Sequence, residues 1–283
     1  MPRSLIGLLL AAIGAAAPAQ QLSFAPRADG AQVPMMVYPA ASPSSTGCPP
    51  LALLSPGAGG SEQGLRYLAQ GLGADGWRAI VIGHRESGMD ALKRDVRTTR
   101  GLRAGLAMLV DDPAAYRARF MDIDAARQWA SAPCKAPFTA LLGHSMGAHT
   151  VQFEAGARNT AGLHPAGGFD AYVALSPAGP EAWLPADADA AITAPVLMIT
   201  GTRDAGLGGD ERWREQAFAA LPPGHCDRLA VIDGATHMQL GGGNFDARTQ
   251  QAVVALVTTW LDGLRAGTCK PAPALERVRI QDK

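Results

Sequence analysis

Short apolar runs alternate with amphipathic stretches along most of this chain. Each run is bounded by glycine, proline or polar residues, as is typical of strands buried inside a sheet. Such strands are predicted at residues 51–55, 78–83, 138–142, 172–176, 196–201 and 229–233. Helical periodicity lies between them, at residues 63–74, 90–110, 113–130, 148–157, 210–220 and 247–264. This alternation of strand and helix predicts an α/β domain with a mostly parallel central sheet and helices on both faces.

The two ends of the chain depart from this alternation. Residues 22–24 and 33–38 predict a hairpin turned near residues 29–30, and a linker rich in proline and serine follows at residues 39–50. Residues 1–19 combine one arginine, an apolar run too short to span a bilayer, and small residues before Gln20. They predict a signal peptide, with a buried first helix as the alternative. The folded domain is expected over residues 20–268 and a loose tail over 269–283.

Composition and charge narrow the possible functions. With 283 residues, 47% of them hydrophobic, the chain can bury one large core. Its 25 basic and 25 acidic residues give a formal charge of zero, so total charge predicts neither a nucleic-acid partner nor a membrane surface. The six histidines show no metal-ligand spacing. We therefore expect no metal and no cofactor.

One motif carries candidate chemistry. Gly143-His144-Ser145-Met146-Gly147 lies between a predicted strand and a predicted helix. A serine hydroxyl is a weak nucleophile, and a sharp turn of this kind lifts it toward a base and toward backbone N–H donors. Ser145 is therefore the predicted nucleophile, and His144 is expected to pack the turn and line the pocket.

Two later strands end in candidate partners for Ser145. Asp204 follows the strand at 196–201, and His237 follows the strand at 229–233. Loops at the carboxyl ends of parallel strands line one crevice, so the three residues can converge as a triad. His237 would act as the base, and Asp204 would orient its ring. As alternatives, Asp204 is a helix cap, with Asp210 as the reserve acid, or His237 is an ordinary loop histidine.

Backbone donors for an oxyanion are predicted at two positions. One is the N–H of Met146, directly after the nucleophile. The second is the N–H of Ala58, in a glycine-rich loop at residues 55–60 whose small residues allow close approach to a substrate. The alternative is a phosphate-binding loop, which is less favoured because no Walker lysine follows.

The Ser-Pro-Gly of this loop, the Gly-His-Ser-Met-Gly turn and Asp-Gly-Ala-Thr-His around His237 resemble bacterial secreted α/β-hydrolase esterases. The resemblance covers residues 51–264. Within this superfamily, the chain is most similar to the cutinase-like polyester hydrolases and to the platelet-activating-factor-acetylhydrolase-like or dienelactone-hydrolase-like group. Polyester hydrolases carry an aromatic residue where this chain has Ala58, and dienelactone hydrolases proper use a cysteine where it has Ser145.

The resemblance implies an α/β-hydrolase fold. We expect no large lid, because residues 177–194 are too few to form one. Trp183 in this segment would either flank the acyl site or pack the loop. Residues 84–86, His-Arg-Glu, border the same crevice edge and are expected to form a structural salt-bridge loop.

Four cysteines in an exported chain predict two disulfides and a periplasmic or secreted location. In the hydrolase sheet implied by the resemblance, the strands after Cys48 and Cys134 are neighbours, which favours that pair. Cys226 and Cys269 would form the second pair. Four reduced cysteines are the alternative.

The leading functional hypothesis is a serine hydrolase that cleaves a small-molecule or lipid carboxylic ester through an acyl-enzyme. A lipase or polyester hydrolase is the alternative among enzymes. A catalytically silent binding protein with this fold is the alternative from another class.

Overall fold

The computed structural model describes residues 19–41, 47–181, 183–206 and 210–283. Residues 1–18 of the predicted signal peptide lie outside the described residues. Within them, nine strands form one sheet in the order β1-β2-β4-β3-β5-β6-β7-β8-β9. Neighbours from β4 to β8 are parallel, whereas β1, β2 and β9 pair antiparallel at the edges. The strands are β1 (Gln21–Pro26), β2 (Gln32–Tyr38), β3 (Leu51–Ser55), β4 (Arg78–Ile82), β5 (Thr139–His144), β6 (Ala171–Leu175), β7 (Val196–Arg203), β8 (Arg228–Thr236) and β9 (Val278–Asp282).

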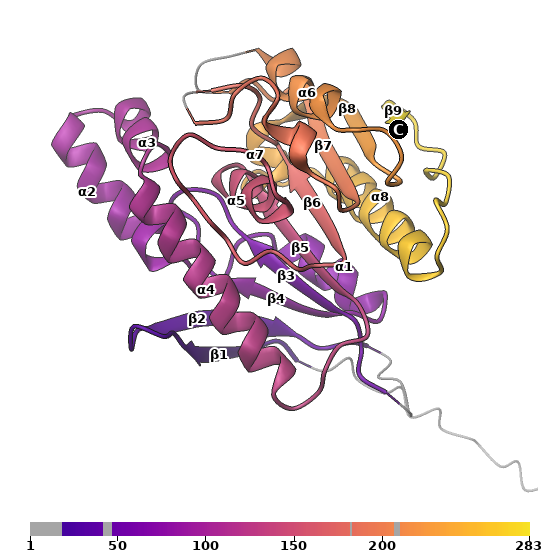
Figure 1. The fold of residues 1–283 in the computed structure, drawn as a ribbon, viewed down its shortest axis with the longest axis horizontal. Coiled ribbons are helices and arrows are strands. Elements are labelled where there is room, and N and C mark those ends of the chain that lie inside the picture. The colour runs from indigo at the N-terminus through magenta and orange to yellow at the C-terminus, as the bar shows by residue number, and fades with distance from the viewer. Residues whose placement is uncertain (1–18, 42–46, 182, 207–209) are drawn as a thin grey trace, which may run out of the picture.

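Helices cover both faces of the sheet, as predicted (Figure 1). The core between sheet and helices has two parts, one built with α4, α5 and α6 and the other with α1 and α8. The described helices are α1 (Arg66–Ala74), α2 (Met89–Thr99), α3 (Leu102–Val110), α4 (Pro113–Ser131), α5 (Met146–Ala155), α6 (Glu211–Ala220), α7 (His237–Leu240) and α8 (Ala247–Arg265), with 3-10 turns η1 (Arg85–Ser87) and η2 (Ala188–Ala191). β3 and β6 are buried along their whole length because both of their faces are covered.

The single helix predicted over residues 90–110 is wrong. The chain forms α2 and α3 instead, separated at Arg100, whose φ of 57° is left-handed and ends a helix. Gly105 of α3 lies so close to α2 that a Cβ there would come within 2.6 Å of the Val96 nitrogen. Hydrophobic periodicity continued across the break, so the pattern did not reveal this hairpin of helices.

The expectation of a loose C-terminal tail is also wrong. Residues 278–282 form β9, which pairs with β8 and covers its edge. Asp282 binds the buried Arg228 at 2.5 Å, and Val278 and Ile280 pack against the core. An alternating pattern of only five residues in a charged segment gave too weak a strand signal.

Two disulfides lie near the amino-terminal ends of the parallel strands. Cys48 is bonded to Cys134, ahead of the neighbouring strands β3 and β5. Cys226 is bonded to Cys269, between the start of β8 and the end of α8. These are the two pairs that the sequence argument favoured.

Between β6 and β7, the described residues form η2 and irregular loop rather than a set of covering helices. Trp183 in this segment packs edge-on against Tyr116, with ring centroids 6.1 Å apart. Among the helices of the described ranges, none combines the length and apolar character needed to cross a bilayer.

Removal of residues 276–283 tests the role of β9. We expect the free energy of unfolding to fall by about 2–4 kcal/mol, because the β8 ladder and two half-buried aliphatic side chains lose their partners. Guanidinium unfolding of the oxidised protein measures the change. An unchanged unfolding midpoint would mean that the tail does not stabilise the sheet.

Candidate active site

Ser145 lies on a strained turn between β5 and α5. Its φ of 56° and ψ of −122° are unfavourable for a residue with a side chain, and surrounding packing must hold them. A Cβ on Gly143 would overlap the Gly147 carbonyl oxygen, and a Cβ on Gly147 would overlap that of Ser55. Both glycines of the motif are therefore required by close backbone contact.

The three sequence-predicted residues come together at the carboxyl ends of the parallel strands. Nε2 of His237 lies 3.0 Å from Oγ of Ser145, and Nδ1 of His237 lies 2.8 Å from Oδ1 of Asp204. These partners assign the Nδ1 proton to the bond with Asp204, which leaves Nε2 free to accept the serine proton. The arrangement has the geometry of a nucleophile, its base and an orienting carboxylate.

Asp204 is fully buried, and its carboxylate has three partners. Thr200 donates to Oδ2 at 2.9 Å, and Nε of Arg214 lies 3.0 Å from Oδ1, the oxygen that His237 also contacts. Burial alone raises the pKa of Asp204, but the hydrogen bond from His237 and the charge of Arg214 together lower it below its usual range. The carboxylate is therefore charged at neutral pH.

The reserve acid Asp210 has a different role. It is the N-cap of α6 and accepts a hydrogen bond from the Trp213 N–H at 3.0 Å. The capping role considered for Asp204 thus belongs to Asp210, six residues later.

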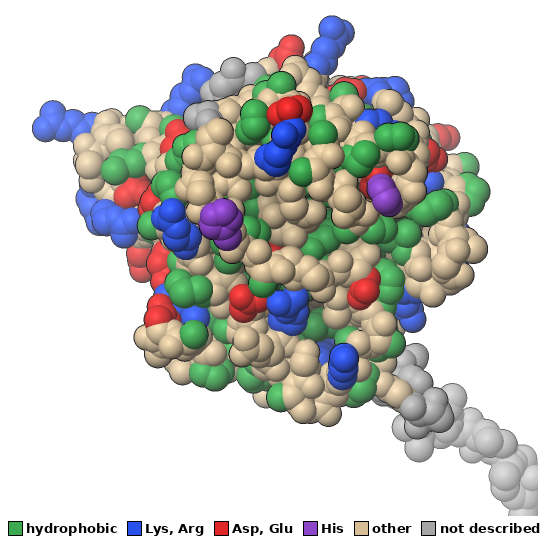
Figure 2. All heavy atoms as spheres, viewed as in Figure 1, with side chains coloured by type: hydrophobic (Ala, Val, Ile, Leu, Met, Phe, Trp, Pro, Cys, Tyr) green, Lys and Arg blue, Asp and Glu red, His purple; other side chains and the backbone are tan. Residues whose placement is uncertain are grey.

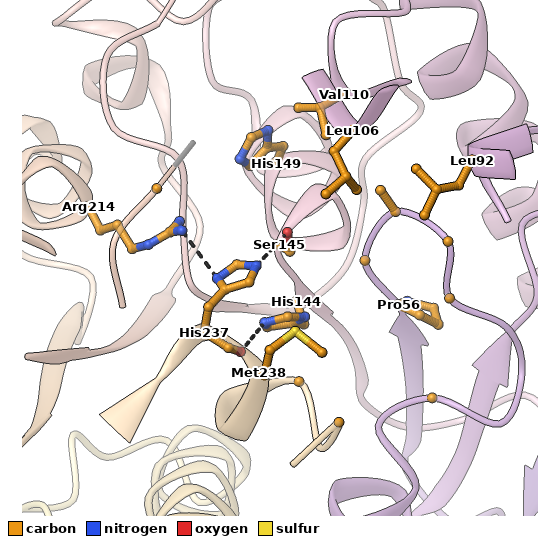
Figure 3. Close-up of a pocket in the computed structure, with 18 of the residues that line it drawn as sticks. Pro56, Leu92, Leu106, Val110, His144, Ser145, His149, Arg214, His237 and Met238 are labelled. Carbon is orange, nitrogen blue, oxygen red and sulfur yellow. Dashed lines mark hydrogen bonds between the residues drawn. The ribbon is translucent and has the colours of Figure 1, made fainter. Parts of the chain in front are cut away.

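Arg214 is a site residue that the sequence reasoning missed. Its Nη1 donates to the carbonyl oxygens of Ser176 and Pro177, each at 2.9 Å, and its Nη2 lies 3.2 Å from Nδ1 of His237. Figure 3 shows Arg214 and Ser145 on opposite sides of the His237 ring. A signal was present, because Arg214 shares the buried stripe of α6 with Ala217 and Phe218.

Two further histidines line the cavity as neutral groups. Burial lowers the pKa of both His144 and His149 to about 3. Nε2 of His144 lies 3.0 Å from the His237 carbonyl oxygen and can donate to it, which ties the turn at Ser145 to the loop that carries the base. His144 thus packs the turn and lines the cavity, as expected.

The two predicted backbone donors lie at the ends of elements beside Ser145. Met146 is the first residue of α5, so its N–H has no acceptor within the helix. Within the described part of the chain, the Ala58 N–H has no hydrogen-bond acceptor, whereas Gly59 and Gly60 donate to Ser87 and Gly57. A Cβ on Gly57 would lie 3.2 Å from that of Ser145, so this loop packs directly against the candidate nucleophile.

A cavity of about 690 Å³ opens over Ser145 and His237. Apolar side chains from the α2 and α3 hairpin form one wall, which Figure 3 shows on the far side of Ser145 from His237. This wall consists of Met89, Leu92, Leu106 and Val110. Met238 and Trp213 add apolar surface to other parts of the cavity.

On the outer surface, Figure 2 shows side chains of both charges interspersed over one face of the molecule.

Residues 84–86 are not among those that line this cavity. His84 and Glu86 instead take part in contacts with Asp122 and Arg27, in agreement with the structural salt-bridge loop expected from sequence. No group of three or more His, Cys, Asp or Glu side chains in the described residues is placed to hold a metal ion.

Comparison with known proteins identifies the fold. No family model matches the sequence, and no curated protein matches it. Among solved structures, a dienelactone hydrolase from Anabaena variabilis is 17% identical with a TM-score of 0.60, over 87% of this chain and 98% of that one. Esterase 2 from Thermogutta terrifontis, phosphorylated by paraoxon, is 16% identical with a TM-score of 0.61, over 90% and 97% of the two chains.

Dipeptidyl peptidase 4 from Porphyromonas gingivalis is also similar, at 12% identity and a TM-score of 0.55, over 86% of this chain but 35% of that one. At these identities the likeness shows the fold. The chain has the α/β-hydrolase fold that the sequence predicted.

Replacement of Arg214 by Gln tests the electrostatics of Asp204. Because the folded state lowers the pKa of Asp204, this carboxylate stabilises the fold fully above its unfolded pKa of about 4, and the contribution is lost as pH falls from that value through the lower folded-state pKa. Without Arg214, we expect unfolding at pH 7 to become easier by about 3–5 kcal/mol. The deficit should narrow as pH falls from about 4 toward the lower folded-state pKa of Asp204, because the carboxyl takes up a proton over this range and its attraction to Arg214 is lost.

Unfolding at pH 7 and at pH 2.5 measures both effects. Arg277→Gln is the control, because it breaks an exposed ion pair with Asp233 and should change stability by less than about 1 kcal/mol. An equal deficit at the two pH values would show that Arg214 acts through packing alone.

Proposed function

We propose that this chain is a serine hydrolase that cleaves carboxylic esters through an acyl-enzyme. The observation that carries the proposal is the hydrogen-bonded series Asp204, His237 and Ser145 at the floor of a largely apolar cavity. The α/β-hydrolase fold and the esterase among its structural neighbours support it. A candidate nucleophile, base and orienting carboxylate within hydrogen-bond distance of one another support an enzyme over a silent binding protein.

Acylation follows from this arrangement. His237 takes the Ser145 proton on Nε2 as Oγ attacks the ester carbonyl carbon, while Asp204 accepts a hydrogen bond from the Nδ1–H of His237. Negative charge moves to the former carbonyl oxygen, which the N–H groups of Ala58 and Met146 bind. The bond to the alkoxy oxygen then breaks, and the alcohol leaves with the proton from His237.

Deacylation repeats the same steps with water. His237 takes a proton from the water, whose oxygen attacks the acyl carbon bound to Ser145. When that intermediate collapses, Oγ is the leaving group and receives the proton back from His237. The carboxylic acid is released, and the serine is restored.

The lining of the cavity favours an ester with an apolar acyl or alkyl group. Burial lowers the pKa of His144 and His149 to about 3, so these two lining histidines carry no charge at neutral pH. One wall of the cavity is the apolar surface of α2 and α3. Long-chain lipid or polyester substrates, the alternative, would contact the same wall.

The two disulfides support a periplasmic or secreted enzyme.

The nucleophile is tested by Ser145→Ala. The wild-type protein should hydrolyse p-nitrophenyl esters and react with a fluorophosphonate, and the variant should lose about 10⁴-fold or more of the ester rate and all labelling. Circular dichroism checks that the variant is folded. No turnover and no labelling of folded wild-type protein would refute the proposed function and favour a binding role, and labelling without ester turnover would point to peptide substrates.

The apolar wall is tested by Leu106→Trp. A larger side chain at this position should shorten the cavity and lower kcat/KM for octanoate by about 10–100-fold while acetate changes little. Leu102→Trp is the matched control, because Leu102 lies on the same helix but is 62% exposed and does not line the cavity. If kcat/KM fell by the same factor for esters of every acyl-chain length, the proposal that α3 lines the acyl site would be wrong.

A further inference from the structure

The fold contains a second Ser, His and Asp series, which lies beneath the loop that carries Ala58. Oγ of Ser55 lies 2.9 Å from Nε2 of His84, and Nδ1 of His84 lies 2.9 Å from Oδ2 of Asp122. Ser55 is fully buried, and His84 is 3% exposed. No substrate reaches this serine, so the series calls for a role other than nucleophilic attack.

The protonation of this series follows from its partners. Burial lowers the pKa of His84 to about 4, so the ring is neutral at pH 7. Asp122 can only accept, which assigns the ring proton to Nδ1 and leaves Nε2 to accept from the Ser55 hydroxyl. Oγ of Ser55 then has a lone pair free for another donor, and that donor is Arg119, whose Nη1 lies at 3.1 Å.

Arg119 extends from α4 to the underside of the loop. It is 1% exposed, and Nη1 also donates to the Pro56 carbonyl oxygen at 2.7 Å. Nη2 makes a longer contact of 3.4 Å with the Gly57 carbonyl oxygen, and Nε donates to Ser87 at 2.8 Å. Burial lowers the pKa of Arg119 to about 10, so the side chain remains a cation at neutral pH.

These carbonyl groups bear directly on the candidate oxyanion donor. The Gly57 carbonyl and the Ala58 N–H belong to one peptide group, and in a trans peptide they point in opposite directions. Holding the carbonyl toward buried Arg119 therefore directs the N–H away from α4. The Gly57 carbonyl also accepts from Gly60 at 3.0 Å, and the Gly59 N–H is bonded to Ser87. The loop is thus anchored on both sides of Ala58.

We propose that Arg119, held in place by Ser55, His84 and Asp122, is a positioning residue that aims the Ala58 N–H at the oxyanion of the reaction. Two hydrogen-bond donors on one planar guanidinium fix the orientation of consecutive carbonyl groups more firmly than an ammonium can. A charged donor on the carbonyl also polarises the peptide, which strengthens its N–H as a donor. The proposal rests on the ester hydrolysis proposed above.

Arg119→Lys tests this role, because it keeps the charge but loses the planar set of donors. We expect kcat for p-nitrophenyl butyrate to fall by about 10–100-fold, part of the loss seen when an oxyanion donor is removed outright. The KM should change by less than about 3-fold, since the apolar wall is untouched. Affinity for an alkyl trifluoromethyl ketone, which forms a tetrahedral oxyanion on Ser145, should fall in proportion to kcat/KM.

Arg228→Lys is the matched control. Arg228 is also buried, at 4% exposed, and binds Asp282 and the Lys270 carbonyl far from the loop. Its variant should lower the unfolding temperature and leave kcat unchanged. If Arg119→Lys loses stability alone, with wild-type kcat and ketone affinity, the positioning role is wrong and Arg119 is a structural residue.

Ser55→Ala gives a second, milder test that does not remove a buried charge. It deletes the group that joins His84 to Arg119, and kcat should fall by a smaller factor than in Arg119→Lys with KM unchanged. An unchanged kcat would exclude the series from the positioning role. If wild-type protein neither hydrolyses the ester nor binds the ketone, the proposed function itself fails, which is distinct from either outcome.

Discussion

The contact between the end of β3 and the start of α5 is the constraint on which the rest of the site depends. Gly147 leaves no room for a side chain against Ser55, and Gly143 leaves none against Gly147. Backbone thus packs on backbone around a serine with φ of 56°. The strain at Ser145 persists because the parallel strands on either side hold the end of β5, and the contact of Gly147 with Ser55 holds the start of α5. The same packing brings the loop with Ala58 to the serine.

Two buried arginines donate hydrogen bonds to loop carbonyl groups on opposite sides of Ser145. Loops that leave the carboxyl ends of β3 and β6 carry carbonyl groups that have no strand partner, and burial would leave them unsatisfied. Arg119 donates to Pro56 and Gly57, and Arg214 donates to Ser176 and Pro177. Each cation is buried in a polar network rather than exposed to solvent. Both networks fix backbone that borders the reacting atoms.

The two Ser, His and Asp series show why geometry alone does not define a nucleophile. In both, successive members are about 3 Å apart. Ser145 opens onto the cavity and adjoins two backbone N–H groups, whereas Ser55 is enclosed and faces a cation. Access and the surroundings of the hydroxyl separate a reactive serine from a structural one. The sequence offered no sign of the second series, since Ser55, His84 and Asp122 follow no spacing rule.

The sequence by itself determined the parallel sheet, the turn at Ser145 and the order of Ser145, Asp204 and His237, because short apolar runs and glycine-bounded turns are local signals. Tertiary structure decided what depends on distant partners. The break at Arg100 follows from the packing of α3 on α2, and β9 exists because β8 offers an open edge. The positions of Arg119 and Arg214 were visible only as charges on buried helix stripes. What they bind lies far along the chain, and only the folded backbone brings those carbonyl groups within reach.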